Sequence, residues 1–353
     1  MAAYADALTK RLKKKEGPAP RRSVGKEEAT KLVEEVRERV EESWSAEQEN
    51  RREAALDLRF MAGDQWPEQI RQARQAATRP IPTSNGLPQF VRQVTNDIRQ
   101  ADLAIKAAPV DDTSDPKLAK IYNGLLKQIH YRSSAKAVYA SGAESQASCG
   151  IGWWRVISDY VEETAFDQEL RVVRIPNPLS VYCDPAATLP DRSDAMWMAI
   201  TEMIPRKAFE RRWPNARAES IDVSRDAYSE GFFWNTPDDV RIAEYYRKMP
   251  VKKTVALLEN GDVIDITGKG EGELGAMPIQ QTRDVMAYKV EHYLVSGAEV
   301  LEGPNDWPGR HIPLVPVIGA EIPLEKLTYR HGVIRMARDS QQLMNYYRAA
   351  ATE

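Results

Sequence analysis

Apolar residues recur at helical spacing through the first 150 residues of the chain. The first such stripe consists of Ala29, Val33, Val36, Val40 and Trp44, and it returns at Leu56 and Phe60. Steps of three and four residues place these side chains on one face of a helix. The pattern predicts a long surface helix over residues 27–62.

Three more helices are predicted before residue 150. One begins near Pro88, a residue that fits the first turn of a helix, and a second begins at Asp115-Pro116, where the aspartate can cap. The second is the clearest amphipathic helix, with the apolar positions Leu118, Ile121, Tyr122, Leu125 and Ile129. The third covers about Ser134 to Ser148. Proline- and glycine-rich segments at 60–67 and 79–86 predict loops.

After Gly150 the apolar period shortens to two, which is typical of strands. Asn260-Gly261 favours a tight hairpin because both residues tolerate positive φ. Helix followed by strand, without alternation, predicts the α+β class with mainly antiparallel strands. The predicted strands cover residues 154–157, 170–175, 195–204, 241–247, 254–258, 263–266, 288–294 and 299–301.

The last segment returns to helix from about Gly332 to Glu353. Its apolar stripe consists of Val333, Ala337, Leu343, Met344 and Tyr347. No glycine or proline stop follows this helix, so we expect that the chain is a fragment of a longer protein. A segment that covers this stripe would then come after residue 353, so we expect the stripe to be uncovered in this chain.

Composition excludes several classes of protein. The net charge of −3 argues against a surface that is basic throughout, and no apolar run is long enough to cross a membrane. Two cysteines, Cys149 and Cys183, allow no disulfide framework, and both are expected to be buried thiols. Residues 1–26 carry eight basic and two acidic side chains. With Gly17-Pro18 and Pro20, they predict a mobile basic arm or a contact with an acidic partner.

Motifs for catalysis are weak. The histidines lie far apart, without the spacing of a metal site, and the stretch Gly268–Gly275 lacks the Gly-Lys-Ser/Thr ending of a phosphate-binding loop. Most of the tryptophans lie near arginine or proline in different predicted elements, so core packing or subunit contact is favoured over base stacking. The histidines are His130, His292, His311 and His331, and these tryptophans are Trp66, Trp153, Trp154, Trp197, Trp213, Trp234 and Trp307.

One acidic cluster is dense enough to consider as a site. Asp184, Asp191 and Asp194 could hold a divalent cation in a nuclease, although their spacing does not match a calcium loop. Aspartates also cap turns by accepting hydrogen bonds from backbone amides, and this interpretation is favoured. We therefore assign no catalytic, cofactor-binding or metal-binding residue, and we predict that the chain is not an enzyme.

A collinear series of motifs resembles the portal, or head–tail connector, proteins of short-tailed bacteriophages. The series covers roughly residues 60–353 and includes Gly63-Asp64-Gln65-Trp66, the segment 79–85, Gly150–Val156 and Asn177–Pro185. It ends with Gly332–Arg335 and Arg338–Tyr347. A series in one order is more specific than any single motif.

The resemblance implies a structural subunit of the ring through which phage DNA is packaged and ejected. Residues 63–330 would form the wing, an α+β domain, and residues 331–353 the start of a stem helix, with clip, crown and barrel absent. The implied partners are copies of itself in a dodecamer, the terminase large subunit, major capsid and scaffolding proteins, a tail adaptor and double-stranded DNA. The implied location is the portal vertex of the virion, and the host cytoplasm during assembly.

Two alternatives stay open at this point. The first is a metal-dependent DNA-processing enzyme that uses Asp184, Asp191 and Asp194. The second is a monomeric adaptor or scaffold that uses the basic arm and the long helix.

Overall fold

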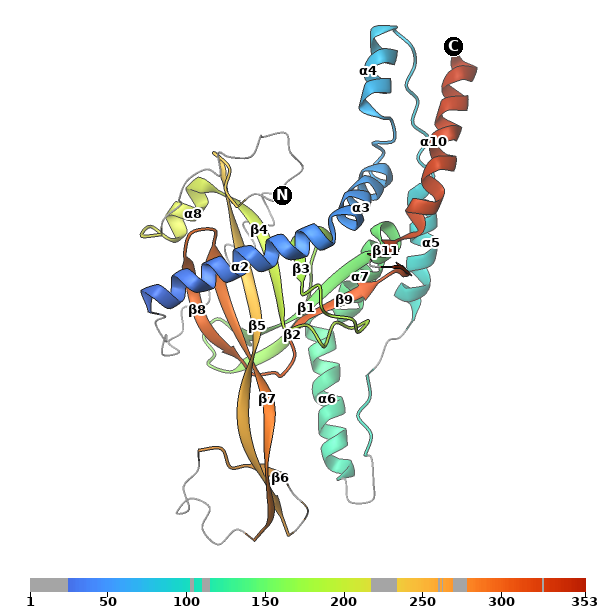
Figure 1. Ribbon diagram of the computed structural model, residues 1–353. Helices are drawn as coiled ribbons and strands as arrows, with labels where there is room; N and C mark the ends of the chain where they lie inside the picture. The colour runs from blue at the N-terminus through green and yellow to red at the C-terminus, as the bar shows by residue number, and fades with distance from the viewer. Residues whose placement is uncertain are drawn as a thin grey trace. The chain divides into compact units, whose positions relative to one another are not determined.

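A computed structural model describes residues 25–101, 105–109, 115–216, 234–259, 261, 263–268, 278–325 and 327–353 (Figure 1). The chain forms two compact units. Unit 1 holds residues 1–41 and 195–312, and unit 2 holds residues 42–194 and 313–353. Helix α2, Lys26–Ala46, begins in unit 1 and ends in unit 2. Residues 1–24 of the basic arm, the turn residue Asn260 and most of the glycine-rich stretch lie outside the described residues.

The predicted α+β class is confirmed. The helices α2 to α7 precede the first strand, and mainly antiparallel strands follow before the C-terminal helix α10, Val333–Thr352. In the range 27–62 the structure has two helices, α2 and α3, Gln48–Met61, instead of the one predicted. Glu47 separates them, because its side chain binds Arg330 and its backbone leaves the helical conformation.

Unit 1 is an antiparallel sheet with the strand order β4-β5-β7-β8, and β6 pairs with β5. Alternate residues of β5 point to opposite faces of this sheet. Tyr245 hydrogen-bonds to Glu35 of α2 on one face, while Ile242 packs against Phe209 of α8 on the other. The elements are β4 Trp197–Pro205, α8 Arg206–Arg212, β5 Asp239–Leu258, β6 Val263–Asp265, β7 Ile279–Ser296 and β8 Val300–Trp307.

The long strand β5 corrects the prediction of two separate strands at 241–247 and 254–258. Pro250 lies within it, opposite Tyr288 of β7. Strand β4 pairs with β5 only as far as Arg247, so Pro250 lies on an open edge where its missing N–H breaks no ladder. The β5–β7 ribbon therefore continues beyond the sheet to β6 (Figure 1).

Unit 2 places its helices around one core cluster. Phe60 of α3, Leu87 and Val91 of α5, Ala147 of α7 and Ile334 of α10 pack together. The sequence predicts α5 to α7 well, and Asp115 caps α6 by accepting a hydrogen bond from Lys117 N at 2.8 Å. It does not predict α4, whose nine residues include one large apolar side chain, Ile70, and therefore form no apolar stripe. The bounds are α4 Glu68–Ala76, α5 Leu87–Gln100, α6 Pro116–Arg132 and α7 Ala135–Cys149.

The strands of unit 2 form a three-stranded sheet, β2-β1-β9, and a separate hairpin of β10 and β11. The predicted strand at 154–157 lies within β1, and that at 170–175 overlaps β2 as far as Arg174, whereas β3 and β9 to β11 were not predicted. The bounds are β1 Ile151–Tyr160, β2 Gln168–Arg174, the 3-10 turn η1 Pro178–Ser180, β3 Val181–Cys183, β9 Leu314–Ile318, β10 Ala320–Leu324 and β11 Leu327–His331.

Helix α7 lies directly on β1 through glycines. A Cβ atom on Gly152 would lie 1.9 Å from the carbonyl oxygen of Gly142. Gly150, at φ +87°, ends α7 in the left-handed conformation that glycine adopts without strain. The Gly150-Ile151-Gly152 segment thus sets how closely helix and sheet approach. None of the described helices is long and apolar enough to cross a membrane.

Candidate functional site

Helix α10 packs on unit 2 through a face that is partly polar. Its buried residues are Ile334, Gln341, Asn345 and Ala349. Val333, Leu343 and Tyr347, from the predicted apolar stripe, are exposed. A buried amide is costly unless it is hydrogen-bonded, so the contacts of Gln341 and Asn345 decide how the helix is held.

Asn345 joins two distant segments of unit 2. Its Nδ2 donates to Oε1 of Gln65 at 2.6 Å, and its Oδ1 accepts a hydrogen bond from Ser84 N at 3.0 Å. Gln341, one turn earlier, donates to Ser84 O at 2.5 Å. Both amides therefore bind the loop that precedes α5.

Gln65 and Asn85 connect this contact to the end of α3. Gln65 Nε2 donates to Phe60 O at 3.0 Å and to Asn85 Oδ1 at 2.9 Å. Asn85 Nδ2 donates to Met61 O at 2.8 Å. The residues Gln65, Ser84, Asn85, Gln341 and Asn345 form one connected network, which we name the α10 junction.

Aromatic rings cover the side of the junction. Trp66 and Tyr346 meet edge to face with ring centroids 4.8 Å apart, and Trp66 Nε1 donates to Pro82 O at 3.2 Å. Arg348 hydrogen-bonds to Ser84 Oγ. The motifs Gly63–Trp66, 79–85 and Arg338–Tyr347, which the sequence analysis quotes separately, therefore meet at one place.

A buried ion-pair cluster adjoins the junction. Arg335 Nε lies 2.9 Å from Asp57 Oδ2, and Arg338 reaches Asp57 Oδ1 at 3.2 Å and Glu53 Oε2 at 2.9 Å. Burial raises the pKa of the Asp57 carboxyl, although both arginines favour its ionised form. For Glu53, burial would raise the pKa, but the hydrogen bond and charge of Arg338 outweigh it and lower the pKa. The cluster holds α10 to α3.

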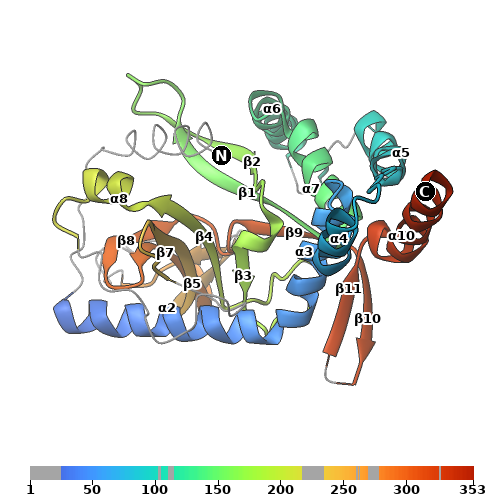
Figure 2. The same ribbon diagram turned by 90° about the horizontal axis from the view of Figure 1, so that it is seen from above.

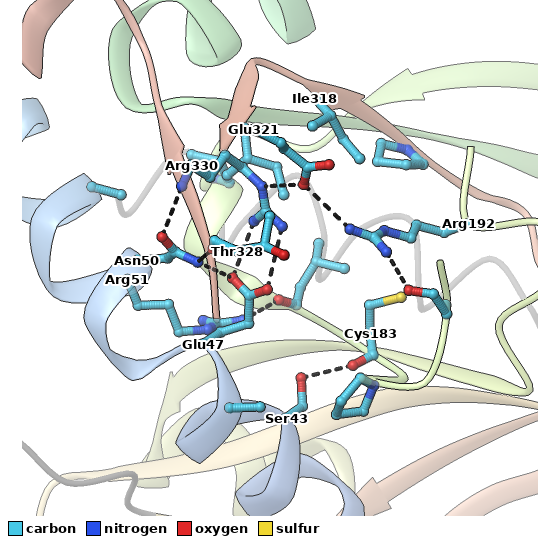
Figure 3. Close-up of a pocket in the computed structure, with 18 of the residues that line it drawn as sticks. Ser43, Glu47, Asn50, Arg51, Cys183, Arg192, Ile318, Glu321, Thr328 and Arg330 are labelled. Atoms are coloured by element: carbon cyan, nitrogen blue, oxygen red, sulfur yellow. Dashed lines mark hydrogen bonds and ion pairs between the residues drawn. The ribbon is translucent and has the colours of Figure 1, made fainter. Parts of the chain in front are cut away.

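A cleft of about 450 Å³ opens in unit 2, beside the β10–β11 hairpin (Figure 3). Arg330 lies at its centre, with Nη1 3.1 Å from Glu47 Oε2 and Nε 3.1 Å from Glu321 Oε1. Arg192 also pairs with Glu321, at 3.4 Å. On the opposite wall, Ser43 Oγ donates to Cys183 O at 2.8 Å. In Figure 3, Arg330 and Arg192 are thus paired with carboxylates, while Arg51 donates to the backbone oxygens of Leu179 and Val181.

The cleft brings both cysteines into one lining, but it does not activate them. Burial raises the pKa of the Cys149 thiol to about 11 and that of Cys183 to about 12. Thiols with such pKa values stay protonated at neutral pH and are poor nucleophiles. The expectation of a buried thiol holds for Cys149, while Cys183 is half-buried.

The predicted acidic cluster forms a set of turn caps. Asp184 accepts a hydrogen bond from Ala186 N, Asp191 from Ser193 N, and Asp194 from Thr188 N at 2.6 Å and Leu189 N at 3.1 Å. Hydrogen bonds from these backbone amides lower the pKa of Asp191 and of Asp194. Over the described residues, no group of three or more His, Cys, Asp or Glu is arranged to hold a metal ion.

The other predicted candidates lie apart in ordinary packing positions. His130 contacts Tyr139, His292 packs on Tyr246, His311 lies beside Arg310, and His331 is half-buried. Trp66, Trp153, Trp197 and Trp234 are buried, as core packing predicts. The residues of the α10 junction were not singled out as a site, because the pattern of one segment gives no sign of the others that it meets.

The comparisons with known proteins agree with this arrangement. The family model described as "Phage P22-like portal protein" matches residues 37–353. A "Portal protein" of Acyrthosiphon pisum secondary endosymbiont phage 1 is 24% identical over 278 residues, which are 74% of this chain and 38% of that relative. The chain thus spans less than two fifths of the length of the curated relative. The family match includes unit 1 from residue 37, all of unit 2 and the α10 junction, and the chain belongs to the P22-like portal protein family.

Proposed function

We propose that this chain is a structural subunit of the portal ring at the head–tail vertex of a phage, where the ring forms the conduit for DNA packaging and ejection. The observation that carries the proposal is the family match over residues 37–353. The role is geometric: copies close a ring, and the ring surrounds the path of the DNA.

The structure supports a role in which α10 contacts other chains. One face of α10 is held by the junction and by the Asp57 cluster. On the other face Met336, Leu343 and Tyr347 are 73%, 52% and 68% exposed. Apolar side chains at steps of seven and four residues lie on one side of a helix and favour packing against another helix. A helix with one face fixed to its own subunit and an exposed apolar face on the other side is suited to contact a second subunit.

The charge of the chain fits a conduit. A net charge of −3 leaves no excess of basic residues to hold phosphates along the path, and strong phosphate binding would slow DNA that must slide. The proposed partners are further copies in a dodecamer, the terminase large subunit, major capsid and scaffolding proteins, and a tail adaptor. The proposed locations are the portal vertex and, during assembly, the host cytoplasm.

Electron microscopy tests the proposal directly. The natural gene is given an epitope tag within the segment that encodes this chain, and particles of its own phage are labelled with gold-conjugated antibody. We expect label at one vertex of each particle, and rings with a central hole after particle disruption. Label spread over the whole capsid, or particles without the protein, would contradict the proposal.

A further inference from the structure

Helix α6 turns an apolar face to solvent. Leu118, Ile121, Tyr122 and Leu125 lie on one side of the helix and are 48%, 65%, 51% and 51% exposed. The helix has no buried residue. Asn123, on another side, exchanges hydrogen bonds of 2.7 and 2.9 Å with the backbone of Ala107 and so holds the helix against its own chain. Within the described residues, this face of α6 is uncovered.

The β10–β11 hairpin carries a second uncovered apolar face. Ile322 pairs with Tyr329, and Leu324 pairs with Leu327, so these four side chains share one face of the ribbon. Each is 40% to 58% exposed. The opposite face is fixed to the body of unit 2, because Arg330 pairs with Glu47 and Glu321. A two-stranded hairpin is marginal alone, and its free face needs a partner.

The two faces lie on opposite sides of unit 2. Figure 2 shows α6 on one side of the unit and the hairpin on the other, with α3 and β9 between them. A closed ring needs such an arrangement, because each subunit must present one surface to the neighbour before it and a different surface to the neighbour after it.

Charged residues border both faces, and in the hairpin the acidic Glu325 is followed in the sequence by Lys326. Helix α6 carries the exposed lysines Lys117, Lys120 and Lys127, and it has no acidic residue. The hairpin has the exposed Glu325 at its turn. Exposed Asp191 lies in the turn next to Arg192, which pairs with Glu321 of β10. The lysines would repel the same face of a second α6, whereas Glu325 offers them an acidic partner, so the hairpin is favoured over α6 itself as the surface that covers α6.

We infer that the apolar face of α6 in one copy binds the apolar face of the β10–β11 hairpin in a second copy of the chain. The inference rests on the proposed function, because it assigns one of the contacts that would close the ring. The contact joins two different surfaces, so it repeats from head to tail and leaves one surface free at each end of an open chain.

Single substitutions test each surface by sedimentation of the whole chain over a range of concentrations. Leu125→Asp on α6 and Leu324→Asp on the hairpin should each weaken self-association about tenfold or more, since a carboxylate then faces an apolar surface. Both residues are more than half exposed, so neither change disturbs the core of the subunit. Tyr131→Asp is the matched control, because Tyr131 is 87% exposed on another side of α6 and should leave association unchanged.

Mixing the two variants gives the sharper result. Each variant retains one intact surface, so an equimolar mixture should form a one-to-one complex and nothing larger. Charge reversal adds an independent test: Lys117→Glu should weaken association about two- to fivefold, and Glu325→Lys in the same chain should restore it. A mixture that behaves as two separate monomers overturns the inference.

Cross-linking decides whether the surfaces meet. A chain with Leu125→Cys and Leu324→Cys, treated with a short bis-maleimide, should give a ladder of multimers that the unmodified chain does not give. Rings that persist in both aspartate variants and give no ladder overturn this inference while the proposed function stands. A chain that stays monomeric without a ladder also overturns it, and the gold-labelling experiment then decides the function separately. If Leu125→Asp leaves self-association unchanged but the particles lose another structural protein, then α6 binds that protein and the inference is overturned.

Discussion

Asn345 and Gln65 lie 280 positions apart in the sequence, and their side-chain amides share a hydrogen bond of 2.6 Å. Both residues are almost completely buried, at 1% exposure each. In such surroundings a polar atom needs a hydrogen-bond partner, and Asn345 Nδ2 and Gln65 Oε1 supply one to each other. The position of α10 is therefore specified by hydrogen bonds as well as by apolar contact.

Asn345→Ala should lower the free energy of unfolding by about 2–3 kcal/mol, because Gln65 Oε1 and Ser84 N lose their partner in a buried place. Urea unfolding measures the change. Ser340→Ala, on the exposed side of the same helix, is the control and should change stability by less than about 0.5 kcal/mol. Equal effects of the two substitutions would show that the junction contributes nothing specific.

Asp57→Ala should cost about 3–5 kcal/mol, since it leaves the guanidinium groups of Arg335 and Arg338 partly buried with one partner fewer. Glu49→Ala removes an exposed carboxylate from the same helix α3 and should cost less than about 1 kcal/mol. Thermal unfolding in low and high salt compares them. The role of the cluster would be contradicted if Asp57→Ala lost no more stability than Glu49→Ala and if its loss depended on salt.

Gly152→Ala should prevent close packing of α7 on β1, because its Cβ would overlap the Gly142 carbonyl oxygen at 1.9 Å. We expect a loss of at least about 3 kcal/mol or failure to fold. Gly124→Ala is the opposite case, since the Cβ meets nothing within 4 Å in the middle of α6. It should stabilise the chain by about 0.5–1 kcal/mol. Circular dichroism during heating follows both variants.

Divalent cations should leave the melting temperature unchanged. The carboxylates of Asp184, Asp191 and Asp194 are directed to the backbone amides of their own turn. Asp194→Ala should lower the melting temperature equally with Mg²⁺, with Mn²⁺ and with a chelator. A stabilising shift that needs metal, together with cleavage of plasmid DNA that this substitution abolishes, would favour the alternative of a DNA-processing enzyme.

The native thiols should react slowly with Ellman's reagent at pH 8, and at the full rate once the chain is unfolded. Burial raises the pKa of Cys149 to about 11 and that of Cys183 to about 12, whereas an unfolded cysteine ionises near pH 8.5, as a rough reference value. The folded state thus binds more protons than the unfolded state above that pH. Stability should therefore fall as pH rises from about 8.5 towards 11. Rapid reaction of both thiols with Ellman's reagent in the folded chain would contradict this prediction.

Capping residues and apolar periodicity within one segment predicted the helices and strands whose formation depends on that segment alone. Asp115-Pro116 starts α6 because a carboxylate cap and a first-turn proline act within one turn. The prediction left a gap around Pro250 in β5, and whether a proline interrupts a strand depends on whether the strand pairs on its N–H side. Helix α4 has one large apolar residue, Ile70, so no apolar period marks it.

The candidate site was harder to predict because its members are polar and distant. Gln341 and Asn345 look like surface residues of an amphipathic helix, and only the segment at Ser84 and Gln65 makes them interior. Asp184 and Asp194 are the opposite case: they look like site residues in the sequence but cap turns in the structure. Aspartates are suited to both uses. Residue type alone cannot separate these uses.

The amides of the junction also determine how α10 would respond to a pull along its axis. A stripe of leucines can slip by one turn, ~5.4 Å, and bury nearly the same area. One turn from Asn345 the buried face carries Ala349 on one side and the longer amide Gln341 on the other, so neither residue reproduces the contacts of Asn345. Force applied to the helix would therefore pass into α3 and into the loop before α5 rather than be lost in slippage. In mechanical terms, α10 would resist sliding along its axis, and a force applied at its C-terminal end would be transmitted to the body of unit 2.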